Sequence, residues 1–229
     1  MIKNKLVVFS GAGISAESGL KTFRDSNGLW ENYKVEDVAT PEAWKRNPHR
    51  VLSFYNQRRK QVIEAKPNAA HYALVELEKK FDVQIITQNI DDLHERAGSK
   101  KVLHLHGEIT KSRSSLHPDL VYKVPETEIN IGDTCEKGSQ LRPHVVWFGE
   151  SVPQMESACR IVEKAAVFII VGTSLSVYPA ASLIEFVPRD APKYLIDPQP
   201  LNRSSIPNLV IKRENAVIGI TEVVNNLLK

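Results

Sequence analysis

Residues 87 to 107 read TQNIDDLHERAGSKKVLHLHG, and they directly continue a β-branched, apolar run, Val83–Thr87. Such a run is typical of a buried strand. A short helix fits Ile90–Ala97, and a second apolar run, Val102–Leu105, leads to His106. The stretch therefore predicts strand, helix and strand in succession, which is the repeating unit of a parallel α/β sheet.

Polar side chains follow both predicted strands. Gln88, Asn89 and Asp91 come after the first strand, and His106 comes after the second. Open α/β sheets bind their ligands at the carboxyl ends of the strands. Taken singly, Asn89 and Asp91 are explained as helix caps and His106 as an ordinary surface histidine. Together they predict a ligand site.

The first strand of the sheet is predicted at Lys5–Ser10, and GAGIS, residues 11 to 15, follows it. Closely spaced glycines between a strand and a helical pattern favour the approach of a phosphate to the backbone. The spacing departs from the dinucleotide fingerprint because Gly19 comes too late to be the third glycine, and a plain turn also explains the first two. Residues 16 to 30 form a polar loop with embedded aromatic side chains, which is typical of a lid.

The remaining chain alternates between strands and helices. Residues 40 to 81 are predicted helical, with a long helix at Pro48–Glu64, whereas residues 107 to 145 lack helical periodicity. The sheet is expected to resume at Val145–Phe148. Further strands are predicted at Val167–Val171, Lys193–Ile196 and Leu209–Lys212, and further helices at Pro153–Lys164, Pro179–Val187 and Val217–Leu228.

Composition sets limits on function. The chain has 229 residues, 42% hydrophobic and 25% charged, as in ordinary globular proteins. A net charge of +3 is too diffuse to indicate nucleic-acid binding. No apolar run approaches the roughly 20 residues that span a bilayer, and Met1 leads almost directly into a core strand, which leaves no room for a signal peptide. Two cysteines indicate no disulfide framework. We expect a cytoplasmic protein without nucleic-acid or membrane partners.

These observations predict an α/β fold: a Rossmann-like doubly wound parallel sheet with a smaller satellite module. We expect one domain, residues 1–229. Its Rossmann-like core comprises about 1–30, 82–107 and 145–229. A helical insertion comprises about 31–81, and a small module about 108–144.

Several stretches in order resemble the sirtuin family of NAD-dependent protein deacylases. They are GAGISAESGL with TFR, then TQNID, HLHG, LRPHVVWFGE and GTSLSVYPA, and they extend from about Gly11 to Ala216. The resemblance implies that NAD is a co-substrate and that acyl groups leave lysine as O-acyl-ADP-ribose, with nicotinamide as the other product. It also implies an acyl-lysine protein or peptide bound as an added strand. We expect a monomer.

The resemblance assigns roles to individual residues. His106 is implied as the general base, which suits an imidazole that titrates near neutrality, and Asn89 as a second catalytic residue. Val146, Trp147 and Phe148 are implied to pair with the substrate. The implied cofactor site consists of Gly11, Ala12, Gly13, Ser15, Phe23, Arg24, Trp30, Gln88, Asn89, Ile90, Asp91, Gly172, Thr173, Ser174, Asp197, Pro198, Gln199 and Ala216. An Asn is common in the family at position 197, and the carboxylate here is expected to favour NAD over NADP.

Three residues point to the acyl group. Ala39, Tyr55 and Arg58 are similar to those of the family branch that accepts succinyl, malonyl and glutaryl lysine. A small side chain at position 39 leaves room for a longer acyl chain. A hydroxyl and a guanidinium on one helical face can hold its terminal carboxylate. Desuccinylation is therefore expected to exceed deacetylation.

The chain departs from the family at the structural zinc site, which many sirtuins build from two Cys-x-x-Cys pairs. The corresponding segments here are Ser114–His117 and Cys135–Gly138, so one thiol and one imidazole remain. Structural zinc requires four ligands. We expect no zinc; the alternative is a rebuilt site that adds a carboxylate such as Asp119 or Asp133.

Two other functions fit the same scaffold. One is an NAD-dependent ADP-ribosyltransferase or NAD hydrolase, which tolerates loss of His106, whereas deacylation requires it. The other is an NAD-responsive binding module, which has no need of a general base. Arg142 and Glu150 are interpreted as structural residues.

Overall fold

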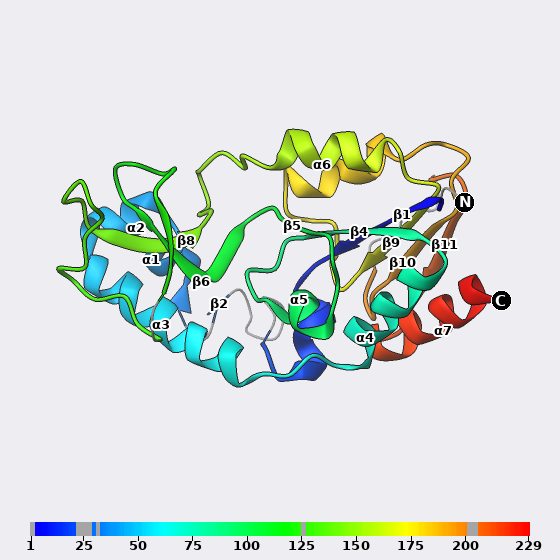
Figure 1. Cartoon of the computed structure of the whole chain (residues 1–229), viewed down its shortest axis with the longest axis horizontal. Helices are drawn as coiled ribbons and strands as arrows, with labels where there is room; N and C mark the ends of the chain where they lie inside the picture. The colour runs from blue at the N-terminus through cyan, green and yellow to red at the C-terminus, as the bar shows by residue number, and fades with distance from the viewer. Residues whose placement is uncertain (1–2, 22–28, 31–32, 125–126, 201–205) are drawn as a thin grey trace.

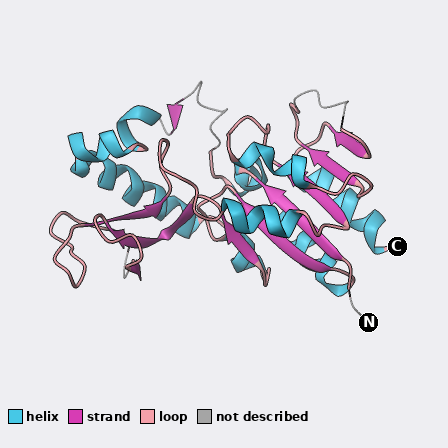
Figure 2. Ribbon diagram, turned by 90° about the horizontal axis from the view of Figure 1, so that it is seen from above, coloured by secondary structure: helices cyan, strands magenta, loops and turns pink. Residues whose placement is uncertain are grey.

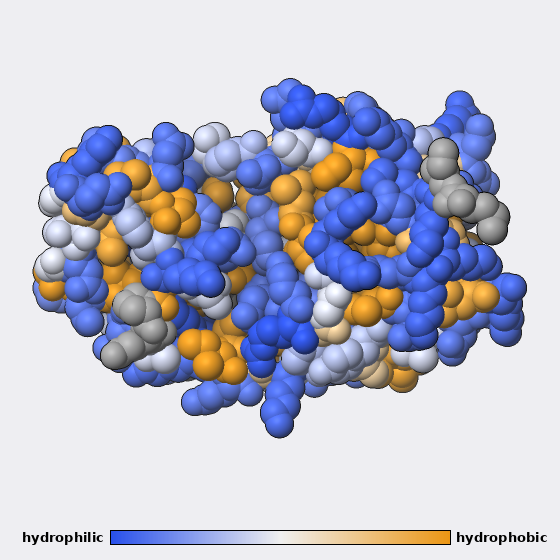
Figure 3. Space-filling view, viewed as in Figure 1, coloured by the Kyte–Doolittle hydropathy of each residue, from blue (hydrophilic) through white to orange (hydrophobic). Residues whose placement is uncertain are grey.

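The computed structural model describes residues 3–21, 29–30, 33–124, 127–200 and 206–229 of the chain. The molecule is elongated, with a parallel sheet and its helices at one end and a smaller module at the other (Figure 1). The first strand and the last helix both belong to the sheet end. Polar residues cover much of the face drawn in Figure 3, with apolar patches between them. Within the described residues, no helix is long and apolar enough to cross a membrane.

The main sheet has six parallel strands in the order β11-β10-β9-β1-β4-β5. The chain builds outward from β1 in one direction and from β9 in the other. The strand order therefore reverses between β1 and β9, and the crevice at such a reversal is where α/β sheets bind ligands. The strands are β1 (Lys5–Ser10), β4 (Asp82–Thr87), β5 (Val102–His104), β9 (Val167–Val171), β10 (Lys193–Ile196) and β11 (Leu209–Lys212).

Helices cover both faces of this sheet (Figure 2), which confirms the predicted doubly wound α/β fold. On β1, Val7 and Phe9 pack toward α6 (Met155–Val162) and η3, the 3₁₀ helix Ala180–Phe186. Leu6 and Val8 face the opposite layer, as expected from the two-residue alternation of a strand. That layer consists of α4 (Ala69–Glu76), the 3₁₀ turn η2 (Leu77–Lys79) and α7 (Ala216–Leu228).

The smaller module combines helices with a three-stranded antiparallel sheet in the order β7-β6-β8. Its long helix α3 spans the predicted range, Pro48–Glu64, and the Asn47 side chain caps it by accepting from Arg50 N at 3.0 Å. The other elements are β2 (Leu29–Trp30), β3 (Tyr33–Lys34), α1 (Val35–Val38), α2 (Pro41–Arg46), β6 (Gly107–Ser114), β7 (Val121–Lys123) and β8 (Leu141–Val145).

The structure corrects the prediction that the main sheet resumes at Val145–Phe148. Strand β8 ends at Val145 and belongs to the small antiparallel sheet. The next three N–H groups turn to unrelated acceptors: those of Val146, Trp147 and Phe148 donate to His106 O, Glu150 Oε2 and Ala39 O. A strand needs a regular ladder, so it cannot continue here.

Two other predicted elements differ from those observed. The helix expected from Ile90 is shorter, α5 (Leu93–Ala97). Asp91 Oδ1 accepts the Leu93 N–H at 3.2 Å, which forms a side-chain turn over the residues just before the helix. Helix α4 falls inside the range predicted as a helical insertion, yet it packs on the main sheet beside α7.

Candidate active site

The turns that follow β1 and β9 touch backbone to backbone. Gly11 N donates to Val171 O at 3.0 Å, and Gly13 N donates to Gly172 O at 2.8 Å. A Cβ on Gly172 would lie 2.3 Å from Ile14 N, and Gly172 has φ 64°, in the left-handed region. Only glycine fits there. The glycines predicted to approach a phosphate therefore also close the two turns onto each other.

Beyond this contact, the 3₁₀ helix η1 (Ala12–Ser18) brings Ser15 to the polar residues that follow β4. Asn89 Nδ2 donates to Ser15 Oγ at 3.2 Å, and Ser15 Oγ donates to Asp91 Oδ2 at 3.1 Å. All three side chains are buried. Asn68 fixes the position of η1 by donating to the Ile14 carbonyl at 2.8 Å. The sequence separates Ser15 from Asp91 by 76 residues, and the fold brings the two side chains together.

Burial raises the pKa of Asp91, although the bonds from the Leu93 N–H and from Ser15 work against this shift. A carboxylate that is already desolvated and fixed in place can accept the N–H groups of an amide ligand. The buried cluster of Ser15, Asn89 and Asp91 is therefore suited to recognise a carboxamide.

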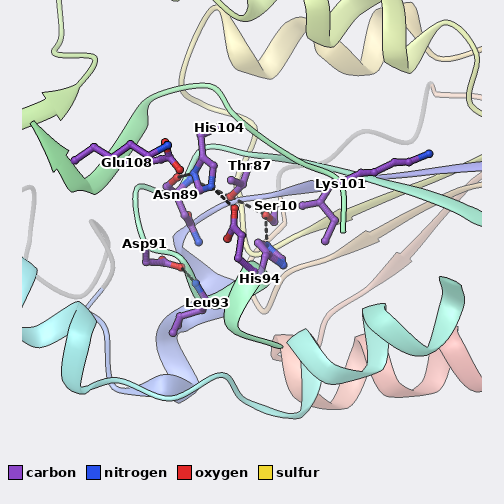
Figure 4. Close-up of polar contacts among 12 residues, drawn as sticks. Ser10, Thr87, Asn89, Asp91, Leu93, His94, Lys101, His104 and Glu108 are labelled. Atoms are coloured by element: carbon purple, nitrogen blue, oxygen red, sulfur yellow. Dashed lines mark hydrogen bonds and ion pairs between the residues drawn. The ribbon is translucent and has the colours of Figure 1, made fainter. Parts of the chain in front are cut away.

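A chain of buried polar groups, Thr87, Ser10 and His94, lies beside Asn89 (Figure 4). Thr87 Oγ1 accepts the Asn89 N–H at 3.0 Å and the Ser10 hydroxyl at 2.9 Å. Ser10 Oγ in turn lies 2.9 Å from His94 Nε2. Since burial lowers the pKa of His94 well below its ordinary value, the ring is neutral at neutral pH. The network fixes the Asn89 peptide without adding charge.

His106 lies just beyond β5, and one of its ring nitrogens is hydrogen-bonded within the protein. Its Nδ1 is 3.0 Å from the Gln88 carbonyl, which can only accept, so Nδ1 carries the proton and Nε2 the lone pair. Burial lowers the pKa of His106, and the bond to Gln88 offsets part of this effect. The ring is thus a neutral base with Nε2 available at neutral pH.

His104 is a further polar residue of this cluster for which no role is predicted. It ends β5, and its Nδ1 lies 2.9 Å from the Asn89 carbonyl. The sequence does contain a signal for His104: residues two apart share one face of a strand, so the pattern His104-Leu105-His106 places both imidazoles on the same side.

The residues implied for the phosphates and the adenosine lie at the ends of β9 and β10. Thr173 Oγ1 accepts the Leu175 N–H at 3.2 Å, and Ser174 Oγ is 2.6 Å from Ser176 Oγ. Asp197 is buried, and its Oδ1 accepts the Gln199 N–H at 2.8 Å. Pro198 lies between these two residues, and Ala216 begins α7. Phe23 and Arg24 lie outside the described residues, as does the side chain of Trp30.

The three acyl-site candidates are all buried. Ala39 and Tyr55 are in one apolar cluster with Trp147, and Arg58 is 8% exposed, one turn after Tyr55 on α3. Trp147 Nε1 donates to Tyr55 Oη at 3.0 Å. Phe148 N donates to the Ala39 carbonyl at 3.0 Å. The segment implied to pair with the substrate therefore contacts two of the three acyl-site candidates.

Arg142 and Glu150 hold Trp147 in place. Arg142 donates to both carboxylate oxygens of Glu150, at 2.7 and 3.1 Å, and its Cζ lies 3.2 Å from the centroid of the Trp147 ring. Glu150 Oε2 also accepts the Trp147 N–H at 2.8 Å. These contacts are consistent with the structural interpretation of Arg142 and Glu150, which here position the Trp147 side chain.

The two segments in which a zinc site was considered from the sequence, 114–117 and 135–138, lie side by side in the small module. Cys135 Sγ lies 3.4 Å from Ser114 Oγ, and Gly138 N donates to the Cys135 carbonyl at 2.8 Å. Within the described part of the chain, His117 and Cys135 gather with neither Asp119 nor Asp133 into a group of three candidate donors.

Comparisons with known proteins agree with this geometry. Residues 11–179 match the Sir2 family. The chain is 54% identical over 223 residues to an NAD-dependent protein deacylase of Bacteroides thetaiotaomicron, covering 95% of each chain. It is 53% identical over 224 residues to one of Helicobacter pylori strain 26695, covering 98% of this chain and 97% of the relative.

Solved structures show the same fold. A crystal structure of a Sir2 homologue–NAD complex aligns with a TM-score of 0.88 and 41% identity, covering 99% of this chain and 90% of that one. A Sir2 variant with deacetylated p53 peptide and 3′-O-acetyl ADP-ribose aligns with a TM-score of 0.80 and 31% identity, covering 98% and 94%. The chain therefore belongs to the Sir2 family and is an NAD-dependent protein deacylase.

Proposed function

We propose that this deacylase removes succinyl, malonyl and similar acidic acyl groups from lysine faster than it removes acetyl groups. One observation carries the proposal: the Tyr55 hydroxyl and the Arg58 guanidinium are buried one turn apart on α3, and Tyr55 shares an apolar cluster with the small side chain of Ala39. A phenol and a guanidinium side by side are donors suited to an anionic oxygen ligand, because charge-assisted hydrogen bonds are stronger than neutral ones.

The terminal carboxylate of a succinyl group is such a ligand. In the described residues, Arg58 donates to Gln61 Oε1 and to the Lys21 carbonyl, both at 3.2 Å. Both acceptors are neutral, and a carboxylate makes a shorter, stronger bond with a guanidinium than a neutral oxygen does. An acetyl group has no carboxylate and gains nothing from this residue.

The Tyr55 hydroxyl accepts a hydrogen bond from Trp147. Trp147 supplies the hydrogen of the bond between the two residues, so that bond uses an oxygen lone pair and not the hydroxyl hydrogen. Burial raises the pKa of Tyr55, and the phenol therefore stays protonated at neutral pH. Its hydrogen can then bond a carboxylate oxygen.

The donor set of the cluster fits NAD. Asp91 and Asn89 can bind the nicotinamide carboxamide and the adjoining ribose, and the residues implied at the ends of β9 and β10 can hold the phosphates and the adenosine. Bound NAD supplies the ribose carbon that the acyl oxygen attacks, with nicotinamide leaving. His106 Nε2 is proposed to accept the proton of the ribose hydroxyl in the next step.

The protein substrate is proposed to lie along residues 146 to 148. Their three N–H groups already donate within the chain, so any pairing there has to use carbonyl oxygens. Asp91, Asn89 and His106 support a deacylase over a binding module, because a sensor needs no general base.

We further propose that the small module holds no zinc. Ser114 and Gly138 offer no strong ligand for a zinc ion beside Cys135. Stoichiometric zinc in metal analysis of tag-free protein that disappears in Cys135→Ser would contradict this.

The acyl preference is tested with matched succinyl- and acetyl-lysine peptides and NAD, following the products by mass spectrometry. We expect the succinyl peptide to have the higher kcat/KM. Arg58→Met and Tyr55→Phe should each lower that value by about ten- to a hundredfold, with little change for the acetyl peptide.

Arg50→Met is the matched control. Arg50 lies on the same helix but is exposed and pairs with Asp37, so its loss should leave the ratio between the two peptides unchanged. Equal losses on both peptides in Arg58→Met would contradict the proposal. Release of nicotinamide without deacylation of either peptide would favour an ADP-ribosyltransferase or NAD hydrolase.

A further inference from the structure

The His104 side chain is enclosed between two elements of the active site (Figure 4). Only 8% of the side chain is exposed. Its Nδ1 lies 2.9 Å from the Asn89 carbonyl, and its Nε2 lies 2.8 Å from Glu95 Oε1 on α5. The imidazole therefore bridges α5 and the loop after β4 that carries Asn89.

The two partners determine the charge of the ring. A peptide carbonyl can only accept a hydrogen bond, and an ionised carboxylate can also only accept. Each nitrogen must therefore donate, which requires an imidazolium. A neutral ring would place a lone pair opposite an oxygen lone pair at one of the two contacts.

The charged groups around His104 are consistent with this. Glu95 on α5 and Glu108 on β6 supply negative charge, and Lys111 on β6 pairs with Glu108. Burial by itself lowers the pKa of His104, but the bond and charge of Glu95, the Asn89 carbonyl and Glu108 outweigh it and raise the pKa above its ordinary value.

Two further titratable groups face the same region. His94, also on α5, is kept neutral by burial, and the Asp91 carboxyl interacts with the charge of His104. Neither competes for the two contacts of the imidazole: His94 bonds Ser10, and Asp91 bonds Ser15 and the Leu93 N–H.

Asn89 has three attachments, and His104 supplies one of them. Thr87 holds its N–H at 3.0 Å, Ser15 holds its side-chain amide at 3.2 Å, and His104 holds its carbonyl at 2.9 Å. The neutral His104 ring carries only one N–H, and the Glu95 carboxylate is a stronger acceptor for it than the Asn89 carbonyl. The carbonyl attachment can therefore be lost as the pH rises, while the other two remain.

We infer that His104 is a positioning residue: as an imidazolium it holds the Asn89 peptide in its catalytic orientation, and its deprotonation sets the alkaline limit of deacylation. The inference rests on the proposed role of Asn89. His106 acts in the opposite direction, because it must be neutral to accept a proton. The rate is expected to fall at acid pH as His106 protonates and at alkaline pH as His104 loses its proton.

A competing explanation for this cluster is that it binds a divalent metal ion. Donor atoms of Glu95, His104 and Glu108 lie within 4.8 Å of one another, the one such group of three among the described residues. A ligand needs the lone pair of Nε2, and an imidazolium has none to give. The test therefore includes added zinc.

The test compares the pH dependence of kcat and KM in the wild type and in His104→Gln, whose amide can still donate to Asn89 but does not titrate. We expect the alkaline fall of kcat to disappear in the variant and the acid fall to remain. At neutral pH, kcat should drop by about three- to tenfold with little change in KM for NAD, because one hydrogen bond is weakened. In Glu95→Gln the alkaline fall should move to lower pH.

Histidine NMR provides a second measurement that does not depend on activity. The His104 resonance, assigned by its absence in His104→Gln, should titrate above the ordinary value of about 6.5. Titration below that value would overturn the inference, as would an alkaline fall that persists unchanged in the variant. Stoichiometric binding of zinc to the wild type but not to His104→Gln would also overturn it.

The outcome is separable from that for the acyl proposal. The ratio of succinyl to acetyl activity depends on Tyr55 and Arg58 and should be the same in His104→Gln. If the enzyme showed no preference for succinyl groups, the alkaline fall of kcat would still be assigned to His104. Full activity of Asn89→Ala would instead remove the role on which the inference rests.

Discussion

At the carboxyl ends of the central strands β1 and β9, Gly13 and Gly172 bring two turns into direct backbone contact. In the small module, long buried side chains instead bond to the backbone. Arg59 is fully buried there, and its guanidinium donates to the carbonyls of Ile109 and Thr127, at 2.6 and 3.0 Å. Arg142 donates to the Val145 carbonyl at 2.9 Å. The contact in the main sheet requires glycines without side chains, whereas the contacts in the small module require long arginine side chains.

The difference follows from what each region can bury. The main sheet has apolar residues on both faces, and β9 is buried along its whole length. The small sheet contributes few residues to an apolar cluster, Ile109 and Val145 among them. Because the three-stranded sheet itself buries few apolar side chains, it needs other interactions to offset the conformational entropy of folding. Here, guanidinium groups bonded to carbonyls supply them, and burial lowers the pKa of Arg59 to about 10.

The largest expected effect is on the glycine contact. Gly172→Ala should lower the free energy of unfolding by about 4 kcal/mol, because a Cβ meets the Ile14 N at the left-handed φ of Gly172. Urea unfolding followed by circular dichroism measures the loss.

Gly19→Ala is the control for that substitution. Gly19 also has a positive φ, 86°, but nothing lies within 4 Å of an added Cβ. Only the backbone strain applies, so the loss should be about 1 kcal/mol. Equal losses in the two variants would show that the close approach of the turns contributes nothing.

The next effect tests the buried arginine. Arg59→Met keeps much of the apolar stem but removes the guanidinium that donates to the Ile109 and Thr127 carbonyls and to Asn56 Oδ1. We expect a loss of about 3 kcal/mol. Hydrogen exchange should accelerate in the small module and stay unchanged in β1 and β4.

Lys60→Met, at the adjacent position of α3, is the matched control. Lys60 pairs with Glu128 at the surface, and both side chains are about half exposed. Such a pair contributes little in water, so this variant should unfold with the wild type. Faster exchange throughout the main sheet in Arg59→Met would mean that the two regions are not separable.

The comparison also explains which features of the fold could be predicted from sequence. β1, β9, β10 and β11 match their predicted ranges, and α3 does as well. Apolar periodicity and helix caps are local signals, and in these elements the tertiary structure agrees with them. The small sheet was predicted only as a region without helical period, because side chains distant in the sequence determine its pairing.

The same distinction holds for the candidate site. Ser15, Asn89 and Asp91 could be predicted to meet because the parallel strands deliver them to one edge. The bond from Trp147 to Tyr55 joins residues 92 apart, and neither has a local pattern that indicates the other. The charge of His104 likewise depends on Glu95 and on a carbonyl, which no spacing rule supplies.

The smallest expected effect comes from the ion pair behind Trp147. Burial raises the pKa of Glu150, but the bonds and charges of Arg142 and the Trp147 N–H outweigh this and lower it overall. A carboxyl whose pKa is lower in the folded state contributes stability above its unfolded pKa. That contribution is lost as the pH falls through the folded pKa. Glu150→Gln should therefore cost about 2 kcal/mol at neutral pH and progressively less in acid.

Urea unfolding of wild type and Glu150→Gln at neutral and acid pH measures this difference. Glu156→Gln is the control, because its carboxylate is 79% exposed and pairs with Arg160 at the surface. If the stabilities of the wild type and Glu150→Gln differ equally at both pH values, the charge of Glu150 is not what matters, and shape alone explains the contact. If they converge in acid, the wall beside Tyr55 depends on an ion pair, as the small module depends on Arg59.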